Sequence, residues 1–260
     1  WEGVKYFLIP NLENFSWMTV VAAMGQMFYS LSIAMGILYT YGSYIKKDVD
    51  IEKSTMQVEI FDTAIAMLAG LMIIPAVFAF SGGNPETLNA GPSLMFITIP
   101  KVFASMGFGT GAGIMFFLLV LLAAVTSAIS LAESGVSTFE DQLGWSRSKA
   151  TLLMGGVIIV IGSASALGFG VLDFVSVLGM TVLDFFDFLT NSLMMPVAAL
   201  ATCLLITRVA GLDKIAKEVE QSSDFKRKKM YFFFMKYLAP VCIAIILLSS
   251  IANVFGWITM

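Results

Sequence analysis

The sequence predicts an all-α membrane protein, and three observations predict it. Apolar residues make up 58% of the 260 residues and charged residues only 13%, whereas a soluble domain is about a quarter charged. Six stretches are apolar enough for a spanning helix, which needs about 20 mostly apolar residues. Lys and Arg gather in alternate connections between these stretches. So little charge could not cover a water-facing surface, so lipid is the expected solvent.

The alternation of basic residues predicts which connections are cytoplasmic. The six predicted spans are residues 15–45, 55–81, 108–138, 150–168, 174–207 and 231–257. The basic residues that follow the first, third and fifth spans are Lys46, Lys47, Lys53, Arg147, Lys149, Arg208, Lys214, Lys217, Lys226, Arg227, Lys228 and Lys229. The positive-inside rule places these connections in the cytoplasm. Residues 1–14 and the C-terminus are then extracellular.

Two connections carry further structure. Residues 82–86 (GGNPE) are typical of a helix start, and the apolar run 94–100 follows them. We expect 82–107 to form a compact extracellular hairpin or a re-entrant segment. Residues 213–229 predict a short amphipathic cytoplasmic helix, followed by a basic run that faces solvent and lipid headgroups.

The composition also excludes some classes of function. Histidine is absent, so this segment holds no His-based proton relay, metal site or catalytic triad. We find no nucleophile–base pair and expect no enzyme. Cys203 and Cys242 lie inside apolar runs and are predicted to be small buried hydrophobes rather than a disulfide. The start at Trp1, with neither an initiator Met nor a signal region, suggests a piece of a longer protein.

The middle of the first span is unusually polar. Gln26, Ser30 and Ser32 lie there between Gly25 and Gly36. A helix can unwind at membrane depth only where protein or a water-filled cavity satisfies its backbone. In many transporters such a break offers carbonyls to a cation and helix ends to a charged substrate. The alternative is that the small residues only let helices pack closely, and composition leaves both open.

Asp62 lies within the second span, which holds no basic residue to offset it. A lone carboxylate at the centre of a span costs about 2.5–3.5 kcal/mol on insertion scales. We therefore expect a cation, a proton or a partner on another helix to stabilise it. The alternative is a wet position near the cytoplasmic end of the span.

The third span carries hydroxyl groups on neighbouring faces. Thr126, Ser130 and Glu133 are spaced i, i+4 and i+7 and share one face, with Ser127 and Leu131 beside them. Hydroxyl oxygens suit a small cation, although Ser and Thr also often bond back to their own helix.

The fifth span has acidic residues near its extracellular end. Asp184 and Asp187 are followed by Asn191, and either they pair with an Arg elsewhere as a gate or they are a solvated helix end. Pro196 is expected to bend this helix.

Four motifs occur in the order found in a known family. They are GQMFYSLSIAMG at 25–36, FITIP at 96–100, AAVTSA at 123–128 and LDFFDFLTNSLMMP at 183–196. They resemble the broken sixth helix, the fourth extracellular loop, the eighth helix and the tenth helix of the neurotransmitter:sodium symporter family. The resemblance covers essentially the whole chain and implies the leucine-transporter fold of two inverted five-helix repeats.

The chain would then be a fragment covering helices 6 to 11 of that fold, with helices 1 to 5 missing. The implied assignment is a broken helix 6 at 15–45, helix 7 at 55–81, extracellular loop 4 at 82–107, helix 8 at 108–138, helix 9 at 150–168, helix 10 at 174–207 and helix 11 at 231–257.

The resemblance also implies roles for individual residues. Ser30 and Asp62 would ligate a first sodium ion, which also touches the substrate carboxylate. The Ala123 backbone and the Thr126 and Ser127 hydroxyls would hold part of a second, and residues outside this chain would complete both sites. The implied substrate pocket is lined by Tyr29, Ser30, Ser32, Met35, Leu38, Ala128 and Leu131. Tyr29 would also act as a lid, and Asp187 would be the acidic half of an extracellular gate.

Two departures from the family pattern are informative. Asp62 and Ala66 stand where chloride-dependent members have Asn and Ser. Because Ala cannot donate to chloride and Asp62 brings its own charge, we expect chloride-independent transport. Met35 stands where an aromatic residue is common. With Ala34 beside it, Leu38 a turn on and no charged pocket position, the flexible thioether predicts bulky hydrophobic or aromatic substrates.

The expected function is sodium-coupled symport of hydrophobic or aromatic L-amino acids by alternating access. The expected location is the plasma membrane (the bacterial inner membrane), with several spans. The expected partners are the amino acid, sodium ions, the bilayer and the missing first-half helices, with no nucleic acid. The alternative is a polytopic subunit or scaffold that does not transport and whose polar groups serve helix packing.

Overall fold

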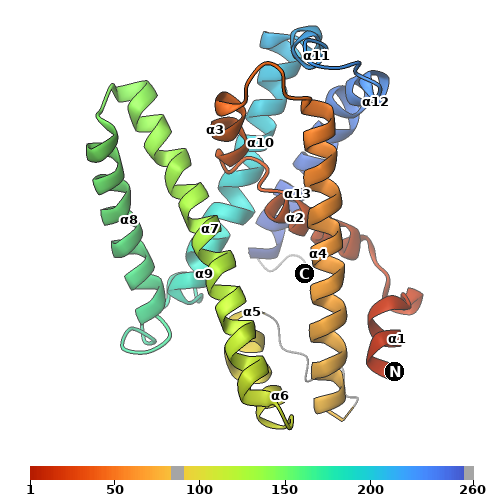
Figure 1. Ribbon diagram of the computed structural model, residues 1–260, viewed down its shortest axis with the longest axis vertical. Coiled ribbons are helices and arrows are strands. Elements are labelled where there is room, and N and C mark those ends of the chain that lie inside the picture. The colour runs from red at the N-terminus through yellow and green to blue at the C-terminus, as the bar shows by residue number, and fades with distance from the viewer. Residues whose placement is uncertain (83–90, 255–260) are drawn as a thin grey trace. The chain divides into compact units, whose positions relative to one another are not determined.

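The computed structural model describes residues 1–82 and 91–254, and this part of the chain is helical apart from one bridge between Val177 and Met180 (Figure 1). The prediction of an all-α protein is confirmed. The chain divides into two compact units. One unit combines Trp1–Phe15 with Gln57–Ala128, and the other combines Ser16–Met56 with Ile129–Met260.

Within residues 1–82 and 91–254, five helical stretches are long and apolar enough to cross a membrane. They are Ile51–Phe80, Gly109–Leu143, Arg147–Leu167, Val182–Ala210 and Lys228–Asn253. The first predicted span, 15–45, is not among them because it divides into α2 (Trp17–Ser30) and α3 (Ile37–Tyr44). The two pieces are each too short to span, and the break between them lies inside the predicted polar segment.

The start of the fifth predicted span also differs from the expectation. Residues 168–181 form turns, and helix α9 (Val182–Asp187) begins at Val182 rather than near 174. Leu178 and Gly179 have φ angles of 54° and 78°, which a helix cannot contain. The Thr181 side chain then accepts a hydrogen bond from the Asp184 N–H and caps the new helix.

The first unit holds α1 (Glu2–Leu8), η1 (Leu12–Asn14), most of α4 (Ile51–Phe80), α5 (Gly91–Ser93), η3 (Leu94–Thr98), α6 (Ile99–Ala104) and the first part of α7 (Gly109–Leu143). Its buried core joins Val77 of α4, Ile99 and Val102 of α6, and Phe116 of α7. The described part of the predicted 82–107 connection is therefore a short helix packed on two long ones. Most of the predicted helix start at 82–86 lies outside the described residues.

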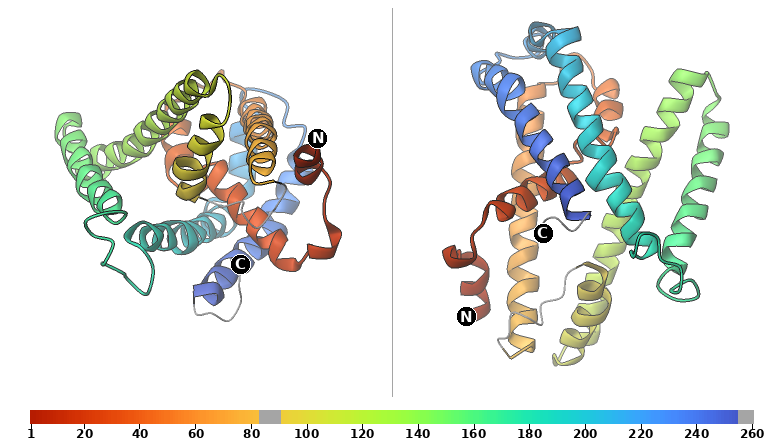
Figure 2. Two further views of the ribbon diagram at one scale, coloured as in Figure 1. Left: turned by 90° about the horizontal axis from the view of Figure 1, so that it is seen from below. Right: turned by 180° about the vertical axis from the view of Figure 1, so that it is seen from behind.

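The second unit holds α2, α3, α8 (Arg147–Leu167), α9, η4 (Phe188–Met194), α10 (Met195–Leu204), η5 (Leu205–Ala210), α11 (Leu212–Val219), α12 (Lys228–Phe233), η6 (Phe234–Leu238) and α13 (Ala239–Val254). Helices α10 and α13 lie side by side in the views of Figures 1 and 2. Ala199, Cys203 and Ile243 form the buried cluster between them, and Phe28 and Ala34 pack against it. Cys203 and Cys242 are both free thiols.

Three π-helical turns each end two residues before a proline. They are η3 before Pro100, η4 before Pro196 and η6 before Pro240. Proline has no N–H to donate, and its ring clashes with the carbonyl four residues earlier. A wider turn moves that carbonyl away. The distortion expected at Pro196 therefore takes the form of the π turn η4.

Candidate functional site

The site is centred on residues 31–36, where the backbone leaves the helix between α2 and α3. The helical hydrogen bonds stop at Ile33, whose N–H donates to the Phe28 carbonyl, and resume at Thr40, whose N–H donates to the Gly36 carbonyl. Ser32, Ala34 and Gly36 have φ angles of 55°, 63° and 82°. For Ser32 and Ala34 a left-handed conformation costs about 1–2 kcal/mol each. Contacts with the surrounding helices must therefore hold the break open.

The closest of these contacts is between Gly36 and α7. A Cβ atom on Gly36 would lie 2.2 Å from the Ser134 Oγ, far inside van der Waals contact. Ser134 is buried, and its hydroxyl donates to the Met35 carbonyl at 3.5 Å. Position 36 therefore requires glycine both for its φ angle and for this close approach.

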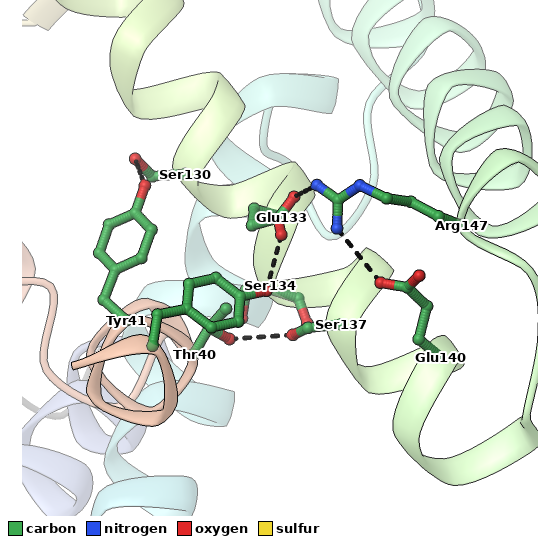
Figure 3. A network of polar contacts seen from close by, with 9 residues as sticks. Thr40, Tyr41, Ser130, Glu133, Ser134, Ser137, Glu140 and Arg147 are labelled. Atoms are coloured by element: carbon green, nitrogen blue, oxygen red, sulfur yellow. Dashed lines mark hydrogen bonds and ion pairs between the residues drawn. The ribbon is translucent and has the colours of Figure 1, made fainter. Parts of the chain in front are cut away.

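Beyond the break, α3 is attached to α7 through hydroxyl groups. Thr40 Oγ1 and Ser137 Oγ share a hydrogen bond of 3.1 Å, and Tyr41 OH and Ser130 Oγ share one of 2.7 Å (Figure 3). One turn further on, the Tyr44 hydroxyl donates to Glu133 Oε1 at 2.7 Å. These bonds continue the line of contacts that begins at Gly36 and Ser134.

The hydrogen bonds of Thr40, Tyr41 and Tyr44 with Ser137, Ser130 and Glu133 form a polar seam between α3 and α7. This seam ends at Arg147, the first residue of α8. Its guanidinium lies 2.7 Å from Glu133 Oε2 and 3.2 Å from Glu140 Oε2 (Figure 3). The Arg147 side chain is 60% exposed and that of Glu133 only 18%. Arg147 therefore neutralises a sheltered carboxylate from the exposed end of a cavity of about 660 Å³, which is lined by Ser43, Tyr44, Glu133, Ser137, Glu140, Asp141 and Arg147.

Sequence reasoning missed this seam. It assigned Ser130 and Glu133 to a face with Thr126 that could bind a cation, whereas the structure uses both side chains to attach α3. One signal was present, because Tyr41 and Tyr44 have the same three-residue spacing as Ser130 and Glu133. Residues three apart lie on one face of a helix, so each pair presents its two polar groups to the same side.

On the other side of the break, α2 borders a hollow of about 460 Å³. It is lined by Val21, Ala22, Gly25, Gln26, Tyr29, Asp187, Asn191, Ser192, Ile246 and Ser250. The Asn191 side-chain amide donates to Asp187 Oδ1. The structure thus brings the predicted lid residue Tyr29 and the predicted gate residue Asp187 to one hollow, with α13 as its third wall.

The other predicted site residues divide between the two units. Ser30, Ser32 and Met35 lie at or beside the break, and Leu38 and Leu131 belong to the same unit. Asp62, Ala123, Thr126, Ser127 and Ala128 belong to the other unit.

Two of the residues in the first unit have informative positions. The Thr126 hydroxyl donates to the Ala123 carbonyl at 2.9 Å, so it bonds back to its own helix. Thr126 Oγ1 and the Ala123 carbonyl oxygen, both predicted sodium ligands, are therefore neighbours. Asp62 is half-buried in α4. At 1.5 Å per residue, about 16 Å of helix separate it from the first residue, Ile51.

Comparisons with known proteins agree on one family. Residues 1–257 match the model of the sodium:neurotransmitter symporter family. The chain is 33% identical over 252 residues to the uncharacterized sodium-dependent transporter YhdH of Bacillus subtilis, which covers 96% of this chain and 55% of that protein. It is 30% identical over 251 residues to an uncharacterized sodium-dependent transporter of Haemophilus influenzae, with 96% and 54% covered.

A solved structure is similar as well. The crystal structure of MhsT in complex with L-phenylalanine matches with a TM-score of 0.82 and 35% identity, over 96% of this chain and 56% of that chain. This chain thus spans about half the length of the relatives it matches. Its fold is the leucine-transporter fold, and its apolar helices make it a multi-pass membrane protein. The chain therefore belongs to the sodium:neurotransmitter symporter family, whose members are transporters and not enzymes.

Proposed function

We propose that the protein to which this chain belongs carries hydrophobic or aromatic L-amino acids across the plasma membrane together with sodium. The observation that carries the proposal is the break at 31–36, where three left-handed residues interrupt a helix inside a membrane protein. Two similarities support the proposal. The relatives are described as sodium-dependent transporters, and the similar MhsT structure was determined with L-phenylalanine.

The sodium ions would bind to oxygen atoms on both sides of the break. Ser30 and Asp62 would ligate the first ion, with the substrate carboxylate as a further ligand. The Ala123 carbonyl, together with the Thr126 and Ser127 hydroxyls, would hold part of the second. The 2.9 Å separation of Thr126 Oγ1 and Ala123 O supports this, because a sodium ion needs several oxygens converging on one point. Residues outside this chain would complete both sites.

The substrate side chain would lie against apolar groups around the break. Its pocket would be lined by Tyr29, Ser30, Ser32, Met35, Leu38, Ala128 and Leu131. Met35 is half-buried in the break itself, and its carbonyl accepts from Ser134. That contact holds the backbone while the flexible thioether adapts to different apolar shapes.

Gating would use the hollow that Tyr29 and Asp187 share. Tyr29 would cover the bound substrate. Asp187, already oriented by Asn191, would pair with an Arg outside this chain to close the extracellular side. Sodium and substrate would together stabilise the closed arrangement, from which the carrier opens to the other side of the membrane.

Uptake by the full-length protein in vesicles tests this function. We expect radiolabelled phenylalanine to accumulate only with an inward sodium gradient, and Ser30→Ala and Asp62→Ala to abolish that accumulation. The matched controls are Ser165→Ala, whose hydroxyl bonds to its own helix, and Asp173→Ala in the turn before α9. Both should transport normally. Sodium-independent behaviour with unaffected site variants would indicate the scaffold alternative.

Chloride dependence is tested separately. Asp62 would supply beside the first sodium ion the negative charge that chloride supplies elsewhere in the family, and Ala66 offers chloride no hydrogen bond. We expect sodium-driven uptake to persist when gluconate replaces chloride. A collapse of uptake in that buffer would show that Asp62 does not replace the anion.

A further inference from the structure

The cytoplasmic end of α12 carries a basic run whose members are fixed in different ways. The Glu52 carboxylate accepts hydrogen bonds from the backbone N–H groups of Lys226 and Arg227, at 2.9 and 3.2 Å. Lys228 Nζ lies 2.8 Å from Glu220. In the part of the chain that the structure describes, Lys229 forms no ion pair. Glu52 therefore holds the segment in place, Lys228 is neutralised, and Lys229 keeps an uncompensated charge.

A second lysine follows inside the helix. Lys236 lies in the stretch Lys228–Asn253, which is apolar enough to cross a membrane, about 12 Å along the helix from Lys228. Its side chain is exposed, and within the described residues it forms no ion pair. Its ammonium group lies 5.3 Å from the centre of the Tyr237 ring. A lysine at this depth is stabilised when its long side chain reaches back to the polar headgroups.

Aromatic side chains lie beside the two lysines, with Phe233 between them in the sequence and Tyr237 directly after Lys236. Lys229, Phe233 and Tyr237 are spaced by four residues and share one helix face. Phe233 and Tyr237 are each 56% exposed, and their ring centres lie 6.0 Å apart. Tyrosine is enriched at the level of lipid headgroups, and the exposed Phe233 ring adds apolar surface next to Tyr237.

The neighbouring amphipathic helix does not offer an alternative membrane contact. The apolar residues of α11 are Leu212, Ile215, Ala216 and Val219, and all but Ile215 are buried inside the protein. Because Ile215 is 36% exposed and its apolar neighbours are buried, α11 offers a bilayer one apolar side chain rather than a face. Membrane recognition at this end depends on the charges and rings of α12 and η6.

We propose that Lys229 and Lys236, with the exposed rings of Phe233 and Tyr237 beside them, form a binding site for an anionic phospholipid. The two ammonium groups would contact the phosphate of the headgroup from two depths, and an acyl chain would lie on the rings. Charge complementarity selects an anionic lipid over a zwitterionic one. This site does not depend on the proposed transport, because none of its residues belongs to the sodium or substrate positions.

The test uses the purified full-length protein in detergent, mixed with phosphatidylglycerol or with phosphatidylcholine of the same chain length. Bound lipids are counted by native mass spectrometry, and thermal unfolding gives an independent readout. We expect phosphatidylglycerol to be retained preferentially and to raise the unfolding temperature more. Each lysine near an anionic lipid surface contributes roughly fivefold to binding, so Lys229→Gln with Lys236→Gln should weaken phosphatidylglycerol binding by about tenfold or more.

Two further double variants make the result specific. Lys229→Arg with Lys236→Arg keeps both charges and should bind like the unmodified protein, which also shows that the fold tolerates change there. Lys214→Gln with Lys217→Gln removes the same charge from the exposed face of α11 and should bind normally. Equal retention of both lipids, unchanged binding by the glutamine variant, or an equal loss in the α11 control would each overturn the proposal.

Discussion

The two halves of the broken helix are attached to their neighbours by different chemistry. The C-terminal half, α3, meets α7 through the Thr40, Tyr41 and Tyr44 hydroxyls. The N-terminal half, α2, packs through apolar side chains, with Val21 buried and Phe28 against the cluster of α10 and α13. Hydrogen bonds weaken steeply away from their preferred geometry, whereas apolar packing is non-directional. The α3 half is therefore held in one register, and the α2 half can shift at lower cost.

This difference is informative for the proposed carrier, which would alternate between two arrangements. The contacts of α3 with α7 are discrete and can only be made or broken, which suits a two-state element. The contacts of α2 border the hollow with Tyr29 and Asp187 and would permit small displacements as the proposed gate closes. Four predictions would break or sharpen this comparison, in order of decreasing effect.

The largest effect is expected at Gly36. In Gly36→Ala the new Cβ would meet the Ser134 hydroxyl at 2.2 Å. The alanine would also have to keep the φ of 82° at this position. We expect uptake to be lost and the free energy of unfolding to fall by about 2–4 kcal/mol, from the left-handed strain and the overpacking together. Thermal unfolding of the full-length protein and sodium-driven uptake measure both.

Two further variants test the cause of the Gly36 effect. Gly42→Ala on the same helix has nothing within 4 Å of its new Cβ and should be neutral or slightly stabilising. Gly36→Ala combined with Ser134→Ala removes the hydroxyl and should recover part of the loss. If Gly36→Ala is as stable as Gly42→Ala, α7 does not constrain the break.

The next effect separates polarity from shape. Thr40→Val keeps the shape of a buried side chain but leaves Ser137 without its Thr40 partner. We expect a loss of about 1–1.5 kcal/mol, the upper part of the range for one hydrogen bond, because Thr40 is buried while Ser137 keeps its bond to the Ser134 carbonyl. In α2, Phe28→Leu keeps an apolar side chain that is only half-buried, and it should cost less than Thr40→Val. The comparison fails if chemical denaturation shows the opposite order.

A smaller effect is expected from Tyr44→Phe. It removes one hydrogen bond to Glu133 while Arg147 still neutralises the carboxylate. We expect the free energy of unfolding to fall by about 0.5–1.5 kcal/mol, with a larger relative change in the uptake rate because the seam sets the register of α3. An uptake rate equal to that of the unmodified protein would show that the seam does not couple to transport.

The smallest effect is expected at Arg147. Its guanidinium is 60% exposed, so solvent screens its pairs with Glu133 and Glu140. Arg147→Gln should change stability by less than about 1 kcal/mol, and high salt should reduce even that difference. A much larger loss of stability would mean that the cavity around Glu133 excludes water. Arg147 would then contribute as much to stability as Thr40.

Much of the fold could be predicted from the sequence. Scarce charge and apolar runs of spanning length are local properties, and so is the polar segment 25–36 in which the helix breaks. The prediction of the family came from short motifs and is confirmed by the match to residues 1–257. The assignments of sodium and substrate residues stay predictions, because they depend on how the two units come together.

What the sequence alone determined is therefore the solvent of this protein, its helical class, the place of the break and the family. Only the tertiary structure decided that α3 pairs with α7 through hydroxyls, that α2 rests on α13 and on the cluster of α10 and α13, and that the backbone at Gly36 has a positive φ beside the Ser134 hydroxyl. The physical reason lies in the solvent. In lipid, an apolar helix has no face that must turn inward, so its pattern does not reveal its neighbours. Contacts between distant residues, such as Tyr44 with Glu133, appear only once the helices are packed.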